Sequence, residues 1–162
     1  MSERAEQLRA QLIRNFKTTE LAREQREPLY DTLCARLATG TAAKQLGLSV
    51  DVLAPGKRGC PYHLHHAQEE MFVILEGVGT LRVAGEMLAV GAGDVVFIPA
   101  GPEDPHQFIN TSGAPLKYLS VSTRQQPEIC EYPDSGKFLA HAPGFDAIQR
   151  RDATLDYWDG EP

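Results

Sequence analysis

The stretch that decides the fold of this chain is Pro61-Tyr62-His63-Leu64-His65-His66-Ala67-Gln68-Glu69-Glu70. Residues two positions apart in a strand point to the same face, so His63 and His65 lie on one face about 7 Å apart along the chain. The short turn that follows places Glu70 at the start of the next strand, where its carboxylate can reach the same point. On that strand the acid shares a face with Phe72 and Ile74, and a carboxylate among apolar groups is costly without a cation.

A fourth candidate ligand lies far along the chain. His106 shares a face with Phe108 and Asn110 on a strand that follows the turn formed by residues 99–101. Three neutral imidazoles and one carboxylate suit Fe(II), Mn(II), Ni(II) or Zn(II), and they leave positions open for water or substrate. We therefore predict one divalent transition metal held by His63, His65, Glu70 and His106.

Other polar residues nearby are out of phase with this ligand set. His66 and Glu69 should face the opposite side of their strands, and Cys60 lies an odd number of positions before His63, so we expect a buried thiol there. The sequence assigns no catalytic residue. The three cysteines match no paired-thiolate zinc spacing, and we interpret them as reduced cytosolic thiols: Cys34, Cys60 and Cys130.

The chain has the size of one globular domain, 162 residues with 42% apolar content, and it divides into three zones. Residues 1–43 form an N-terminal extension in which apolar residues at helical spacing predict a helix around residues 3–16. Residues 44–124 alternate short apolar stretches with Gly and Pro turns about every ten residues, a pattern typical of an antiparallel sandwich or barrel. Residues 125–162 are rich in Pro and turn residues, and we expect an irregular tail packed on the barrel.

The charge distribution bears on the possible partners. The net charge is −6, and residues 46–162 hold eight Lys and Arg against sixteen Asp and Glu, which disfavours binding to nucleic acid. No apolar run approaches the ~18 residues of a membrane span, and the N-terminus lacks the apolar region of a secretory signal. We therefore expect a cytoplasmic protein whose partner is a small molecule, with no nucleic acid and no membrane.

Two motifs of this sequence resemble those of the cupin superfamily. The first, G-x5-H-x-H-x3,4-E-x6-G, is matched from His63 to Gly77, although Lys57 occupies the position of its leading glycine. The second, G-x5-P-x-G-x2-H-x3-N, is matched from Gly93 to Asn110, with four residues in place of two before the histidine. The resemblance implies an all-β double-stranded β-helix, a jelly-roll-like barrel with the metal inside. It also implies turn-forming roles and metal-ligand roles for these residues: Gly77, Pro99, Gly101, His63, His65, Glu70 and His106.

The resemblance leaves the reaction open. We favour a sugar-phosphate isomerase, in which a divalent metal would stabilise an enediolate and cations at the mouth would bind the phosphate. A non-haem Fe(II) dioxygenase and a non-enzymatic small-ligand sensor or scaffold are the alternatives. The candidate cations are Lys44, Arg58, Arg82 and Lys117.

The N-terminal extension also suggests an assembly. Antiparallel barrels leave edge strands that proteins usually cover, and similar barrels often pair back to back. Residues 1–30 can lie across a partner, so we predict a homodimer that weakens when they are deleted. Metal content should persist in that truncated form, because every predicted ligand lies beyond residue 62.

Overall fold

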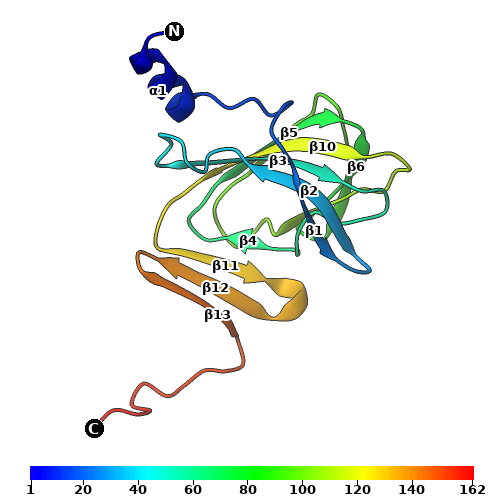
Figure 1. The fold of residues 1–162 in the computed structure, drawn as a ribbon. Helices are drawn as coiled ribbons and strands as arrows, with labels where there is room; N and C mark the ends of the chain where they lie inside the picture. The colour runs from blue at the N-terminus through cyan, green and yellow to red at the C-terminus, as the bar shows by residue number, and fades with distance from the viewer.

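The structure, a computed structural model, describes residues 1–162 and is built almost entirely from strands (Figure 1). None of its helices has the length and apolar character needed to cross a membrane. In chain order the elements are α1 (Glu3–Leu12), β1 (Ala22–Arg26), β2 (Tyr30–Arg36), β3 (Leu46–Leu53), β4 (Leu64–His65), β5 (Glu70–Glu76), β6 (Val78–Val83), β7 (Glu86–Gly91), β8 (Val95–Ile98), β9 (His106–Ile109), β10 (Leu116–Thr123), β11 (Glu128–Tyr132), the short 3-10 helix η1 (Pro133–Ser135), β12 (Lys137–Ala142) and β13 (Phe145–Arg150).

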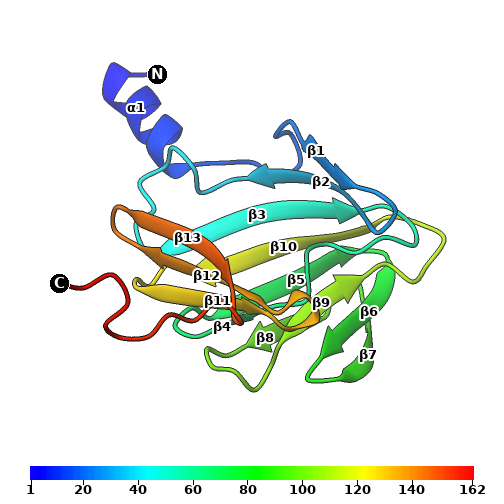
Figure 2. The same cartoon turned by 90° about the horizontal axis from the view of Figure 1, so that it is seen from below.

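The strands form a large sheet and two smaller ones, and all strand pairs are antiparallel (Figure 2). The large sheet has the order β1-β2-β3-β10-β5-β8, and the smaller sheets have the orders β7-β6-β9 and β13-β12-β11-β4. Backbone hydrogen bonds of 2.7 and 3.1 Å between His63 and His106 join the two smaller sheets where β4 approaches β9. The all-β jelly-roll fold predicted from the sequence is confirmed.

The core lies between these sheets and is apolar throughout. Its centre is a set of three rings, in which the ring of Phe72 contacts those of Phe108 and Tyr118 at centroid distances of 4.8 and 5.9 Å. The ring of His106 lies 5.7 Å from that of Phe72, so the core forms the floor beneath the histidines. The members of the core are Leu53, Phe72, Ile74, Leu81, Val90, Ile98, Phe108, Leu116 and Tyr118.

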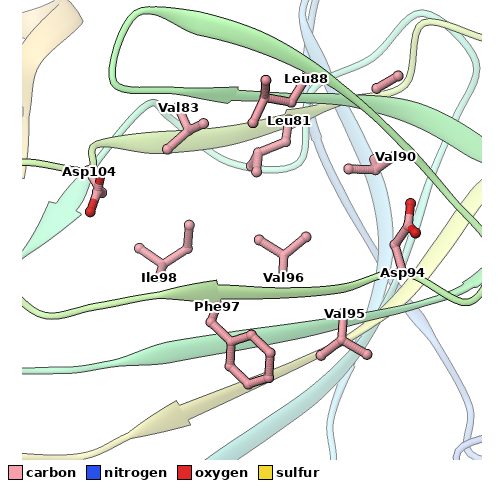
Figure 3. A pocket seen from close by; sticks show the side chains of 11 residues that line it. Leu81, Val83, Leu88, Val90, Asp94, Val95, Val96, Phe97, Ile98 and Asp104 are labelled. Atoms are coloured by element: carbon pink, nitrogen blue, oxygen red, sulfur yellow. The ribbon is translucent and has the colours of Figure 1, made fainter.

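An apolar groove of about 450 Å³ lies between β8 and the β6–β7 hairpin (Figure 3). The side chains of Leu81, Leu88 and Val96 point into it, whereas Phe97 points to the other side of β8 and is 71% exposed. β8 and β7 are the outer strands of their sheets at this place, so the groove marks the seam between them. The turn between β5 and β6 requires Gly77, because φ is +84° there and a Cβ atom would lie 2.4 Å from the backbone oxygen of Pro115.

Both flanking zones differ from the sequence-based expectation. The N-terminal helix ends at Leu12 and buries none of its residues, and the predicted extension also supplies β1 and β2 of the large sheet. The tail predicted to be irregular contains β11, β12 and β13, and regular structure continues to Arg150. Pro127 and Pro133 made this region appear irregular, yet they flank β11 and do not interrupt its hydrogen bonds.

Candidate metal centre

The four predicted ligands meet at one end of the barrel interior. His63 lies directly before β4 and His65 ends it, so the two imidazoles project from one short extended segment. Glu70 is the first residue of β5, and His106 is the first residue of β9. The backbone bridge between His63 and His106 fixes how closely these two segments approach each other.

The ligand atoms converge on one oxygen of Glu70. Its Oε2 atom lies 2.8 Å from Nε2 of His106, 3.5 Å from Nε2 of His65 and 3.7 Å from Nε2 of His63. Ligand atoms of His63, Glu70 and His106 all lie within 4.8 Å of one another. His65 is not part of this group of three, although its Nε2 atom approaches the same carboxylate oxygen. Ligands bonded to a metal at about 2.1 Å lie roughly 3 Å apart when adjacent, which is the spacing seen here.

Two atoms of the cluster lack partners of their own. Oε2 of Glu70 and Nε2 of His106 are buried, and neither has a hydrogen-bond partner of acceptable geometry despite their short separation. Buried polar atoms without partners are costly, and a divalent cation would satisfy both at once. This donor set therefore fits a transition metal.

Backbone carbonyl groups orient two of the imidazoles. Nδ1 of His63 donates to the oxygen of Pro61 at 2.9 Å, and Nδ1 of His106 donates to the oxygen of Asp104 at 3.3 Å. A carbonyl oxygen can only accept, so each contact places the proton on Nδ1. The Nε2 lone pairs are left for a metal, the arrangement that metal-binding histidines usually show.

A carboxylate from the C-terminal part of the chain orients the third imidazole. Nδ1 of His65 donates to Oε1 of Glu128 at 3.1 Å. The same carboxylate accepts the backbone N–H groups of His66, Ala67 and Gln68 at 2.8 to 3.1 Å. Glu128 is 3% exposed, and these four N–H donors satisfy both of its oxygens. It therefore fixes both His65 and the turn that leads to Glu70.

The electrostatics of the cluster also favour metal binding. Burial, followed by the neighbouring His106, lowers the pKa of His63 to about 4, so this imidazole is neutral at physiological pH. Burial alone would raise the pKa of Glu70, but the contact with His106 and the proximity of His65 and His63 outweigh it and lower that pKa. A metal cation binds imidazoles that are neutral and carboxylates that are ionised, and His63 and Glu70 are in these protonation states.

Comparisons with known proteins agree with this geometry. The Cupin domain family matches residues 49–122, which run from β3 to β10 and include all four candidate ligands. The chain belongs to the cupin superfamily.

Individual relatives of this cupin are more distant. An uncharacterized protein of Methanocaldococcus jannaschii is 40% identical over 60 residues, a match that covers 37% of this chain and 46% of that protein. The chain thus aligns with less than half the length of this relative.

Two solved structures are similar over most of the chain. A sugar phosphate isomerase from a cupin superfamily of Silicibacter pomeroyi has a TM-score of 0.71 and 28% identity, over 79% of this chain and 82% of that one. A candidate sugar phosphate isomerase of Acidithiobacillus ferrooxidans has a TM-score of 0.77 and 22% identity, over 86% and 90%, and shows the shared fold.

The residues that the sequence placed outside the ligand set lie mostly as expected. Nε2 of His66 contacts Oε1 of Glu131 at 2.7 Å, away from the cluster. Asn110 is fully buried and holds the turn at residues 110–114, where its Nδ2 donates to the oxygen of Ala114 at 2.8 Å and its Oδ1 accepts the backbone N–H of Ser112 at 3.0 Å. Cys60 differs, because the residue is exposed rather than buried, although its Sγ lies 3.7 Å from Nδ1 of His63.

Two of the proposed phosphate-binding cations of this cupin are engaged elsewhere. Arg82 makes two hydrogen bonds to Asp134, at 2.7 and 2.9 Å. Lys117 lies 3.5 Å from Glu76. Each alternates in its strand with core residues, so both side chains project from the outer face of the barrel.

The sequence analysis missed the contribution of β11. Glu128, Cys130 and Tyr132 alternate along this strand and point inward, and the ring of Tyr132 stacks on that of His63 at 6.3 Å. The period-two spacing of these three residues was the available signal. The prolines on either side of the strand concealed it.

Proposed function

We propose that this cupin is a metal-dependent isomerase of phosphorylated sugars. The observation that carries the proposal is the convergence of three imidazoles and one carboxylate, each imidazole with Nε2 free, on the inner end of the barrel. The likeness to the sugar phosphate isomerase of Silicibacter pomeroyi, which extends over most of both chains, supports this substrate class.

The residues of the cluster would have separate roles in this reaction. His63, His65, Glu70 and His106 would hold a divalent ion, which when bound polarises the carbonyl and hydroxyl oxygens of an aldose or ketose. Burial raises the pKa of Tyr132 above its usual value, so its hydroxyl keeps its proton at neutral pH. That hydroxyl can therefore donate a hydrogen bond to a sugar oxygen beside His63.

The apolar floor restricts access from below. Phe72 and Phe108 close the barrel beneath His106, and both are almost fully buried. These two rings exclude water from that side of His106. Exclusion of water strengthens the electrostatic contacts at the oxygens where charge develops.

The experiment that tests this function is an anaerobic assay of purified protein loaded in turn with Mn, Zn, Ni or Fe. Interconversion of a phosphorylated aldose and its ketose without oxygen is the expected result. The variant H106A should lose bound metal and activity together, whereas H66A, whose side chain points away, should keep both.

Two other outcomes would overturn the proposal. Oxygen consumption that requires Fe(II) would identify a dioxygenase. Thermal stabilisation by a small ligand without any turnover would identify a sensor or scaffold.

A further inference from the structure

The face of the four-stranded sheet that carries Glu128 and Tyr132 also carries two cations, one on β12 and one on the edge strand β13. Glu128 and Tyr132 share this face, and Glu128 contacts the ligand His65. In the sheet register Lys137 lies directly opposite Tyr132, and Arg150 lies directly opposite Lys137. Residues directly opposite in an antiparallel pair share a face, so Tyr132, Lys137 and Arg150 form a row that starts beside the metal cluster.

Measured contacts connect this row to the cluster. Nζ of Lys137 lies 4.9 Å from the ring centroid of Tyr132, and that ring stacks on the His63 ring at 6.3 Å with an angle of 26° between the planes. The Tyr132 ring therefore neighbours both the ammonium group and the candidate ligand His63, and it attracts the ammonium through its π-face.

Neither cation of the row has an acidic partner. Four of the eight Lys and Arg in residues 46–162 pair with an acid, as Lys57 does with Glu27 at 2.7 Å and Arg82 with Asp134 at 2.7 Å. Lys137 has no carboxylate within ion-pair distance, and the recorded side-chain contact of Arg150 is a 3.2 Å hydrogen bond to the carbonyl oxygen of Ser135.

This absence of partners is informative because of the local composition. Residues 46–162 hold twice as many acids as bases, so carboxylates are plentiful in this part of the chain. Lys137 and Arg150, which are adjacent in the sheet and form no ion pair, can bind an anion that the protein does not supply.

We propose that Lys137 and Arg150 bind the phosphate group of the substrate, with the Tyr132 ring as the spacer between phosphate and metal; this inference rests on the proposed isomerase function. In a phosphohexose the phosphorus lies roughly 7 Å from the carbonyl carbon when the chain is extended, by ordinary bond lengths. The His63 and Tyr132 ring centroids are 6.3 Å apart, and Nζ of Lys137 lies 4.9 Å from the Tyr132 centroid. Together these two distances are of the same order as the distance from phosphorus to carbonyl carbon. The compact ammonium group of Lys137 and the planar guanidinium of Arg150 together suit a phosphate dianion.

The test compares the metal-loaded wild-type protein with K137Q, R150Q and the control K117Q. Lys117 is the matched control because it lies on the outer face and pairs with Glu76. Inorganic phosphate is the probe, and its dissociation constant is measured by calorimetry alongside metal content. We expect K137Q and R150Q to weaken phosphate binding by roughly 10- to 100-fold, the effect of losing one charge-assisted hydrogen bond.

Steady-state kinetics with a phosphohexose separates the two proposals. If the phosphate site is correct, K137Q raises KM by a similar factor and changes kcat little, and K117Q changes neither. Unchanged phosphate binding or unchanged KM in K137Q would overturn the phosphate site, even if the wild-type enzyme is an isomerase. Loss of phosphate binding in K137Q, with no isomerase activity in the wild type, would retain the site and refute only the proposed function.

Discussion

Among substitutions that leave all four candidate ligands in place, replacement of Glu128 by Gln should reduce metal affinity most. The carboxylate accepts four hydrogen bonds, one from His65 and three from the backbone of the turn at residues 66–68. The amide of Gln has a single acceptor oxygen, and its NH2 group would face N–H groups. In E128Q, therefore, either Nδ1 of His65 or the backbone N–H groups of residues 66–68 lose their hydrogen-bond acceptor.

The size of the effect follows from these contacts. Loss of one charge-assisted hydrogen bond costs about 1.5–3 kcal/mol. Changes in the residues that orient metal ligands typically reduce metal affinity by about 10- to 100-fold, which is the same range in free energy. We therefore expect E128Q to bind Zn(II) about 10- to 100-fold more weakly than the wild type.

Competition with a chromophoric chelator measures this affinity directly. The matched control is E131Q, because Glu131 lies on the same strand but faces outward, where it contacts His66 and Arg151. Zn(II) affinity should be unchanged in E131Q. An unchanged affinity in E128Q, or an equal decrease in both variants, would refute the role of Glu128 in orienting His65.

Three further predictions concern stability and assembly. Chelation of the metal should lower Tm, since Oε2 of Glu70 and Nε2 of His106 would again be buried without partners; a constant Tm would contradict this. D51N should raise Tm at pH 7, because burial raises the pKa of Asp51 and the ionised form is therefore disfavoured in the folded protein. That gain should vanish below the ordinary carboxyl pKa of about 4, where the side chain is protonated in both states, and a gain independent of pH would count against it. Deletion of residues 1–13, which spares β1, should weaken the predicted homodimer with metal content retained, as measured by light scattering; a full-length monomer would end this idea.

The sequence was sufficient to predict the barrel, and short-range patterns brought three of the four candidate ligands together. His63 and His65 are two residues apart, and a single turn separates them from Glu70. Glycines at turns such as Gly77 mark where strands end, and their positive φ angles explain why.

Long-range contacts could not be predicted in the same way. Glu128 lies 63 residues from His65, and no local pattern specifies which carboxylate an imidazole meets across a barrel. The end of the N-terminal helix was missed for a local reason. The Oδ1 atom of Asn15 accepts the backbone N–H of Lys17, and such a turn competes with helical hydrogen bonds, so the pattern through Phe16 did not extend the helix beyond Leu12.

The position of Glu128 in the chain determines when, during synthesis, the metal centre becomes complete. All four candidate ligands have been synthesised once the ribosome has added His106, but Glu128, which orients His65, follows more than twenty residues later. A nascent chain that ends near residue 122, where the family match ends, would hold its ion loosely. Tight retention of a bound metal would therefore arise late in biosynthesis, and we expect a fragment trimmed to residues 49–122 to exchange its metal faster than the whole chain.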